Sequence, residues 1–356
     1  MPHLFEPFTL QGVTLRNRIG MSPMCQYSAI DGVANEWHLV HYGARAAGGA
    51  GLIIIEATAV EPRGRISPDD LGLWDDSQVE PLKRITHFLK EHGTVPGIQI
   101  AHAGRKAGTH RPWGAPASGA LSSDDTRHWQ AVGPSPLPFS EKYATPQALS
   151  IEGIHALQDA FVNAAQRALA AGIEWLEIHA AHGYLLHSFY SPLANQRTDM
   201  YGGSFENRTR FLLETSTKVR QVWPEHLPLT VRLSCTDWVE HGWSLTDTIR
   251  LAQQLKAVGV DLIDCSAGGN TPNPPATAYP GYQVPFAEAI RRQADLATAA
   301  VGLITAPEHA DEIISSGQAD VVLLGRELLR SPTWPLHAAK ALKQSNPIPG
   351  QYLRGF

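Results

Sequence analysis

Short apolar runs alternate along this chain with longer segments of helical periodicity. The first clear pair is a helical pattern from Glu36 to Ala47, followed by the continuous apolar run from Gly51 to Ala57. An unbroken apolar run of this length is typical of a parallel strand buried on both faces, whereas apolar residues three and four apart mark a helix that packs by one side. The alternation predicts β/α units.

The same pairing recurs along the whole sequence and predicts eight strands. Because a doubly wound sheet usually stops at about five or six strands, eight units favour an α/β fold of the (β/α)8 TIM barrel type, in a single domain over residues 1–356. The strands are predicted at Arg18 to Ser22, Gly51 to Ala57, Val95 to Ala101, Trp175 to His179, Leu229 to Leu233, Leu262 to Cys265, Leu296 to Val301 and Asp320 to Leu324. The helices are predicted at Glu36 to Ala47, Gln78 to His92, Ser150 to Ala171, Phe205 to Val222, Ser244 to Val258 with Ser244 as N-cap, Pro307 to Ser316, and one beginning near Glu327.

Three segments lie outside this alternation. Leu4 to Met21 alternates apolar and polar residues around Gln11 and Gly12, which predicts a short hairpin leading into the first strand. Residues 109–146, rich in Pro, Gly and Ser, form a long insertion between the third predicted strand and the helix that follows it, and we expect this insertion on the active face of the barrel. The C-terminal tail covers about residues 345–356.

Composition narrows the class of protein. The net charge of −5 and the pI near 6.3 provide no general basic field for nucleic acid. No apolar run approaches the roughly 18 residues of a membrane helix, and the N-terminus lacks the basic and apolar regions of a secretory signal. The three cysteines are far apart and form no CxxC motif. We therefore expect a soluble cytoplasmic protein without a disulfide framework.

The strand ending at Ile178 leads into a cluster of proton-handling side chains. His179, His182 and Tyr184 lie within six residues, in the segment EIHAAHGYLLHSFYSPLANQRTDMYGGSFENRTR. Catalytic groups of a barrel stand at the C-terminal ends of its strands, so we expect both imidazoles to donate N–H groups to one substrate oxygen, with Tyr184 as a candidate proton donor. A metal site is the first alternative, although no nearby carboxylate or cysteine completes a ligand set. A purely structural role is the second.

Other strand ends offer candidate ligands for a bound molecule. Arg232 at the inner end of a strand requires an anion or a structural partner such as Asp264. Gln99 suits an amide-like ring edge or is a satisfied core glutamine, and Cys25 is either part of the site or a small buried hydrophobe. Glycine-rich loops after the seventh and eighth strands predict a phosphate cradle, with an ordinary turn as the alternative; its candidate residues are Gly302, Gly325 and Arg326.

Six motifs together resemble the old yellow enzyme family of flavin-dependent ene-reductases, in particular the branch of xenobiotic reductases and thermophilic-like enzymes. The resemblance runs from Leu4 to Phe356. Its motifs are NRIGMSPMCQYS, GIQIAHAGRK, EIHAAHGYLLHSF, SPLANQRTDMYGGSFENRTRF, DLIDCSAG and LLGRELLRSP. The resemblance implies a barrel that holds non-covalent FMN, with the N-terminal hairpin closing the barrel bottom.

The resemblance also implies roles for individual residues. Tyr27, His179, His182 and Tyr184 would line the substrate side, and Cys25 would tune the potential of the flavin. Arg354 from a neighbouring subunit would complete the pocket of a homodimer or homotetramer, although the chain ends in Phe356 where a tryptophan is often found. The flavin ring would be bound by Pro23, Met24, Cys25, Ala57, Gln99 and Arg232, and the phosphate by Gly302, Gly325 and Arg326.

The implied reaction is the ping-pong reduction of activated C=C bonds. NADPH or NADH would reduce FMN, and flavin N5 would then deliver hydride to an α,β-unsaturated carbonyl or a nitroalkene, with Tyr184 supplying the proton. A barrel aldolase is the rival enzyme class, but it requires a strand-end lysine, and none is predicted. Larger relatives with an iron–sulfur cluster need a cysteine run and extra length that this chain lacks. A non-enzymatic flavin-binding protein is the remaining alternative.

Overall fold

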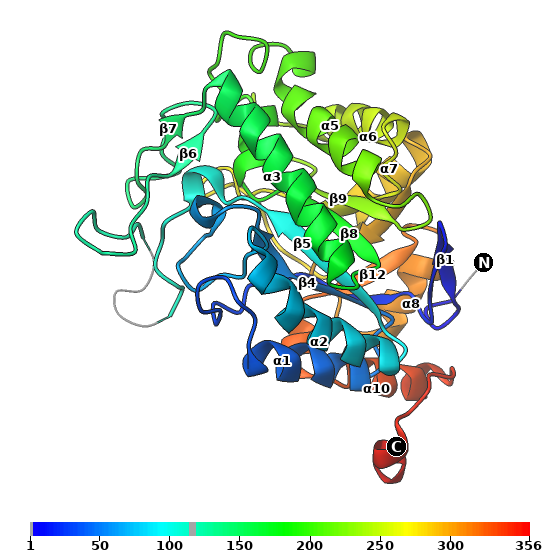
Figure 1. Cartoon of the computed structure of the whole chain (residues 1–356). Coiled ribbons are helices and arrows are strands. Elements are labelled where there is room, and N and C mark those ends of the chain that lie inside the picture. The colour runs from blue at the N-terminus through cyan, green and yellow to red at the C-terminus, as the bar shows by residue number, and fades with distance from the viewer. Residues whose placement is uncertain (1–2, 114–118) are drawn as a thin grey trace.

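Eight parallel strands close into a barrel in the computed structural model, which describes residues 3–113 and 119–356 (Figure 1). Their order around the barrel is β10-β11-β12-β3-β4-β5-β8-β9, so the predicted (β/α)8 fold is confirmed. The strands are β3 (Ile19–Met21), β4 (Leu52–Ala59), β5 (Val95–Ala101), β8 (Trp175–Ala180), β9 (Leu229–Ser234), β10 (Leu262–Ser266), β11 (Ala297–Ala300) and β12 (Val321–Leu324).

The strands are short apolar runs because both of their faces are covered. All eight residues of β4, LIIIEATA, are buried. Its pairing with β5 shifts register between Ile55 and Thr58, which leaves Glu56 and Ala57 without partners in that ladder. Such irregularities often re-aim side chains next to active sites. The shift turns Ala57 toward the cavity described below.

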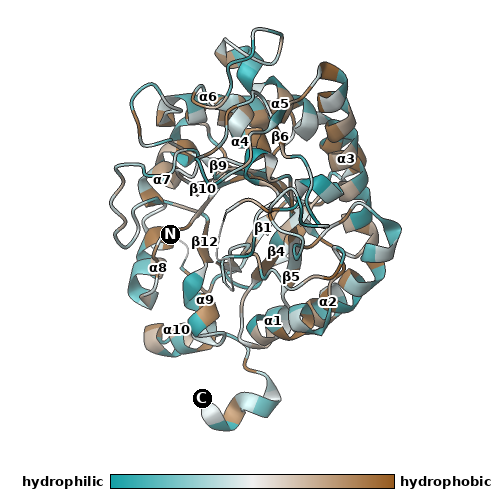
Figure 2. Cartoon of the chain, turned by 90° about the vertical axis from the view of Figure 1, so that its left-hand side faces the viewer, coloured by the Kyte–Doolittle hydropathy of each residue, from teal (hydrophilic) through white to brown (hydrophobic). Residues whose placement is uncertain are grey.

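Helices surround the strands, as the view along the barrel shows (Figure 2). They are α1 (Glu36–Ala47), α2 (Val79–Glu91), α3 (Ile151–Ala170), α4 (Leu185–Tyr190), α5 (Phe205–Val222), α6 (Leu245–Ala257), α7 (Val284–Gln293), α8 (Pro307–Ser315), α9 (Arg326–Arg330) and α10 (Trp334–Leu342), with 3-10 turns η1 (Pro62–Gly64), η2 (Asp76–Gln78), η3 (Gly104–Lys106) and η4 (Gly350–Gly355). Ser244 caps α6 as predicted, with its hydroxyl 3.2 Å from the amide nitrogen of Asp247. Helices α4 and α7 were not predicted, and the last predicted helix is two helices, α9 and α10.

The predicted N-terminal hairpin is formed by β1 (Phe8–Leu10) and β2 (Val13–Leu15). At its tip Gly12 N–H donates to the carbonyl of His226 (2.8 Å), and Gln11 Nε2 donates to Asp261 Oδ1 (2.5 Å). His226 lies three residues before β9 and Asp261 directly precedes β10, so the hairpin lies at the N-terminal ends of these strands. It therefore covers the bottom of the barrel, opposite the catalytic face.

The insertion after β5 contains β6 (Val132–Gly133), which pairs with β7 (Gln147–Ala148) just beyond it. Arg197 ties this segment to the loop after β8, since its Nη1 donates to the carbonyls of Pro134 (3.1 Å) and Leu149 (2.6 Å). Residues 114–118 of the predicted 109–146 segment lie outside the described residues. At its start, the Trp113 ring contacts Tyr27 edge-on at 5.4 Å, so the insertion reaches the active face.

The C-terminal tail projects away from the ring of helices (Figures 1 and 2). It ends in the short turn η4, where Tyr352 and Leu353 are 42% and 62% exposed. Arg354, also exposed, does not line the cavity of its own chain. No helix in residues 3–113 and 119–356 combines the length and apolarity required to cross a membrane.

Candidate active site

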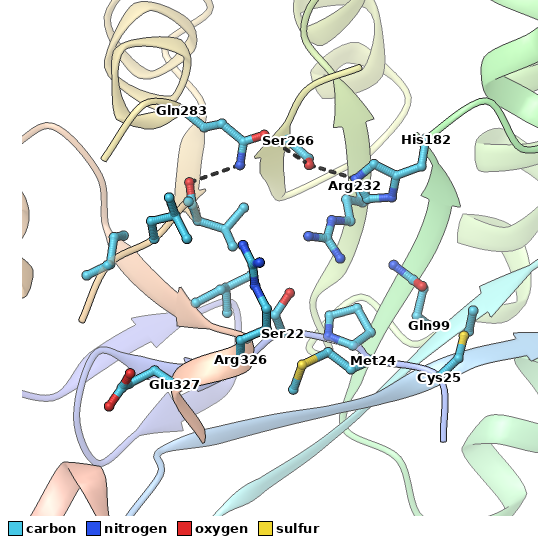
Figure 3. A pocket seen from close by; sticks show the side chains of 18 of the residues that line it. Ser22, Met24, Cys25, Gln99, His182, Arg232, Ser266, Gln283, Arg326 and Glu327 are labelled. Carbon is cyan, nitrogen blue, oxygen red and sulfur yellow. Dashed lines mark hydrogen bonds between the residues drawn. The ribbon is translucent and has the colours of Figure 1, made fainter. Parts of the chain in front are cut away.

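A cavity of about 400 Å³ opens at the C-terminal ends of the barrel strands. Figure 3 shows side chains from opposite sides of the barrel meeting in it. With the exception of Arg354, the structure brings every predicted site residue to this cavity: Pro23, Met24, Cys25, Tyr27, Ala57, Gln99, His179, His182, Tyr184, Arg232, Gly302, Gly325 and Arg326.

Arg232 lies on β9 and projects into the cavity (Figure 3). Its Nε is 3.0 Å from Oδ2 of Asp264, which faces it from the neighbouring strand β10. The pair is buried, and burial raises the pKa of Asp264 while Arg232 opposes that rise. The structural partner considered for Arg232 is therefore present, but the guanidinium still borders the cavity and can meet a second anion there.

Gln99 and Glu177 form a second buried pair on β5 and β8. Gln99 Nε2 donates to Glu177 Oε1 at 2.7 Å, which leaves the Gln99 carbonyl oxygen without a donor among the described residues. Burial raises the pKa of Glu177, the nearby Asp264 carboxylate adds to the rise, and Arg232 opposes it. The NH2 group of Gln99 is thus hydrogen-bonded within the protein, and its carbonyl oxygen can accept a hydrogen bond from a ligand in the cavity.

His179, His182 and Tyr184 stand together as predicted. The His179 ring meets His182 at 5.2 Å and Tyr184 at 4.9 Å, both edge-on. The amide of Ala181 donates to His179 Nδ1 (3.2 Å), so the proton of the neutral ring is on Nε2, which has no hydrogen-bond partner among the described residues. Burial and the charge of Arg232 lower the pKa of both histidines, which keeps them neutral.

Ser266 is a site residue that the sequence analysis missed. Its hydroxyl lies 2.7 Å from His182 Nε2 and 3.4 Å from Gln283 Oε1, and Gln283 Nε2 donates to the carbonyl of Val301 at 3.1 Å (Figure 3). Ser266 directly follows the predicted strand Leu262 to Cys265, a position from which it could have been found. Gln283 precedes α7, a helix that was not predicted, so no sequence signal marked it.

Cys25 and Tyr27 belong to the loop after β3. Both line the cavity and are partly exposed. Burial, reinforced by the neighbouring carboxylates of Asp70 and Glu56, raises the pKa of the Cys25 thiol well above its usual value, so the residue is a neutral thiol. Tyr27, His182 and Leu303 adopt left-handed backbone angles (φ 48°, 60° and 52°), and all three line this one cavity. Such strain concentrates at functional sites.

The loops after β11 and β12 form the far wall of the cavity. The amides of Gly302, Leu303, Gly325 and Arg326 donate no hydrogen bond within the described residues, and the Arg326 guanidinium has no acidic partner there. A Cβ at Gly325 would meet only Met24 Sδ, at 3.6 Å. Free N–H groups beside a cation suit a phosphate. Together with the acceptor of Gln99 and the cation of Arg232, this wall fits FMN.

Comparisons with known proteins agree with this arrangement. The model of the NADH:flavin oxidoreductase / NADH oxidase family matches residues 3–345. The NADPH dehydrogenase of Geobacillus sp. (strain WCH70) is 48% identical over 355 residues, covering 99% of this chain and 98% of the relative. The solved structure of morphinone reductase in complex with tetrahydroNAD superimposes with a TM-score of 0.79 at 26% identity, covering 99% of this chain and 94% of that one.

A further solved structure extends the match. The old yellow enzyme homologue from Zymomonas mobilis has a TM-score of 0.77 at 26% identity, covering 97% of this chain and 94% of that one. The predicted resemblance to old yellow enzyme is confirmed by these matches. The chain therefore belongs to the NADH:flavin oxidoreductase / NADH oxidase family and is an oxidoreductase of the old yellow enzyme type, with FMN as its cofactor and NAD(P)H as its reductant.

Proposed function

We propose that this oxidoreductase reduces activated C=C bonds, in α,β-unsaturated carbonyls and nitroalkenes. The observation that carries the proposal is the free Nε2–H of His179, which lies beside the Tyr184 ring in the same cavity as Arg232 and Gln99. The site thus holds a hydrogen-bond donor for a substrate oxygen close to a hydroxyl group that can protonate a substrate carbon. Carbonyl and nitro oxygens both gain negative charge when the adjacent C=C bond accepts hydride, so both groups suit this site.

FMN would be held by two sets of residues. Arg232 and Gln99, with Pro23, Met24, Cys25 and Ala57, would bind the ring. The free amides and cation at Gly302, Gly325 and Arg326 would bind the phosphate. When bound, FMN would supply the hydride chemistry that couples oxidation of NAD(P)H to reduction of the alkene.

His179 and His182 would bind the substrate oxygen. Both rings are neutral, so each can direct one N–H at the oxygen without bringing a full charge into the site. Donors aimed at developing negative charge in a water-poor site are worth roughly 3 kcal/mol each. The pair would therefore bind the alkene and polarise it in the same contact.

Tyr184 would deliver the proton to the α-carbon, and Tyr27 would line the substrate side opposite it. Burial raises the pKa of Tyr184 well above its usual value, so the phenol remains an acid throughout the neutral range. The cofactor residues and the oxygen-binding histidines share one cavity, so the reductant and the alkene would occupy it in turn. This is a ping-pong scheme, with NADPH or NADH in the first half.

The assembly proposed with this function is a homodimer or homotetramer of single-domain subunits in the cytoplasm. Arg354 would enter a neighbouring subunit's cavity, as in the xenobiotic reductase branch of the family. Support comes from the exposed tail, which carries Arg354 away from its own barrel.

The test is an absorption spectrum of purified protein before and after anaerobic NADPH, followed by cyclohexenone. We expect a yellow protein that NADPH bleaches and the enone recolours. The double variant His179→Ala, His182→Ala should still be bleached by NADPH but recolour at least tenfold more slowly. Recolouring at the wild-type rate would refute the oxygen-binding role, and bleaching that no enone reverses would refute the reaction.

A further inference from the structure

His187 lies on α4, outside the cavity, at the centre of a buried polar group. Its side chain is fully buried and stacks on Tyr190 at 4.7 Å. The amide of Gly183 donates to His187 Nδ1 at 2.8 Å. Because Nδ1 accepts this bond, it cannot carry a proton, and the proton of the ring is on Nε2.

A carboxylate from another loop lies next to His187 Nε2. His187 Nε2 lies 3.0 Å from Asp237 Oδ1, and neither atom makes a hydrogen bond among the described residues. The second oxygen of Asp237 accepts from Ser191 Oγ (2.6 Å) and from the amide of Trp243 (2.9 Å). The two bonds to Oδ2 fix the orientation of Asp237, and the close contact of its Oδ1 with Nε2 then restricts the orientation of the imidazole.

The amide group that donates to His187 belongs to a strained turn. His182 has φ 60° and Gly183 has φ 74°, and a Cβ at Gly183 would come within 2.2 Å of the Gly269 carbonyl oxygen. Two more hydrogen bonds hold the turn, since His182 N–H donates to Ser234 Oγ (2.9 Å) and Lys106 Nζ donates to the His182 carbonyl (2.8 Å). A left-handed histidine persists only where its surroundings over-determine it.

We infer that His187, oriented by Asp237, is a positioning residue that fixes the turn between His182 and Tyr184. The inference deepens the proposed function and rests on it, because the turn carries one oxygen-binding imidazole on one side of Gly183 and the proton donor on the other. Loss of His187 Nδ1 would leave the Gly183 amide without its acceptor. The turn could then relax and separate these two side chains. His187 is not among the residues that line the cavity.

Two variants separate positioning from packing. His187→Asn keeps an acceptor near the place of Nδ1 and loses the ring, whereas His187→Phe keeps a ring that can stack on Tyr190 and loses the acceptor. Both variants remove the contact of His187 Nε2 with Asp237 Oδ1, so a difference between them does not come from that contact. The exposed His87, on α2, provides a control as His87→Phe.

The measurement is the dissociation constant of a phenol, titrated by the absorption of the FMN-loaded enzyme. Loss of one buried hydrogen bond predicts roughly tenfold weaker binding in His187→Phe, with His187→Asn within about threefold of wild type. Equal losses, or a larger loss in His187→Asn, would overturn the inference. If His182→Ala binds the phenol as tightly as wild type, the proposed oxygen site fails instead, so the two failures are distinguishable.

A second measurement tests the tautomer directly. Nitrogen-15 NMR of histidine-labelled holoenzyme at neutral pH should show, besides the signal of His179, a second neutral imidazole with its proton on Nε2. Assignment follows from the loss of this signal in His187→Asn. A His187 ring protonated on Nδ1 would overturn the inference, because Gly183 could not then donate to it.

Discussion

His182 Nε2 lies 2.7 Å from the hydroxyl oxygen of Ser266, and this contact joins the loop after β8 to the end of β10. Ser266 has one hydroxyl proton and two candidate acceptors, His182 Nε2 at 2.7 Å and Gln283 Oε1 at 3.4 Å. If the proton goes to the closer acceptor, His182 carries its own proton on Nδ1. Ser266 therefore decides which nitrogen of His182 can donate to a ligand.

Replacement of Ser266 by alanine tests that relationship. Ser266→Ala leaves His182 Nε2 without a partner and frees the ring to change tautomer, so we expect phenol binding to weaken roughly fivefold to tenfold. The dissociation constant is read from flavin absorption at matched FMN content. Unchanged binding would show that His182 keeps its donor without Ser266.

Removal of the Tyr184 hydroxyl should separate the two halves of the reaction. Tyr184→Phe keeps the ring against His179 but removes the proton, so alkene reduction should slow by roughly 100-fold or more. Stopped-flow absorption should show bleaching by NADPH at close to the wild-type rate. An unchanged rate of recolouring by the enone would exclude Tyr184 as the proton donor.

Cys25 should influence the flavin through its thiol. Cys25→Ser replaces a weak hydrogen-bond donor by a stronger one beside the flavin-binding residues, which favours the more negative reduced form. We expect the midpoint potential to rise by roughly 30 mV, equivalent to about 1.4 kcal/mol for two electrons. Dye-equilibrated titration measures it, and an unaltered potential would leave Cys25 as packing only.

Arg354 should matter only through a neighbouring subunit. Arg354→Ala is expected to raise KM for an enone severalfold in the assembled enzyme, because a cation at the mouth of the neighbour's cavity would be lost. Arg292→Ala, at a residue whose side chain is 65% exposed on α7, is the matched control. Equal KM values for both variants, or a monomer in sedimentation, would contradict this role.

Stability should fall as pH rises because of Glu56. This carboxyl is fully buried at the β4 irregularity, accepts from Gln26 N–H (2.6 Å) and Tyr42 OH (2.9 Å), and burial raises its pKa from 4.5 to about 8. The folded state holds the proton more tightly than the unfolded chain, so its contribution is complete below pH 4.5 and lost as pH rises toward 8.

The expected slope from one such group is roughly 1.4 kcal/mol per pH unit between those two values. Glu56→Gln should flatten the urea-derived free energy of unfolding across this window, with the exposed Glu80→Gln as control. A residual slope is expected from Asp70, where burial raises the pKa to about 7. An identical slope in Glu56→Gln would show that Glu56 is not protonated in the folded state.

The strands and the outer helices could be predicted because their sequence patterns follow directly from burial. The strand from Val95 to Ala101 and the helices at Glu36–Ala47 and Phe205–Val222 have the predicted bounds. Helix α4 was missed because all of its residues are buried, so its pattern shows no polar face. Helix α7 begins at Val284–Pro285 after a proline-rich loop, where no cap marks the start.

The sequence alone determined which side chains reach the catalytic face, because in parallel strands that face is set by strand direction and by the residue at which each strand ends. It offered Asp264 as one alternative partner of Arg232, but it could not determine how the other side chains pair. The contacts of His182 with Ser266 and of His187 with Asp237 each join segments that come together only when the strands assemble into the barrel. Tautomers and donor directions depend on these contacts, so the chemistry of the site was decided by the tertiary structure.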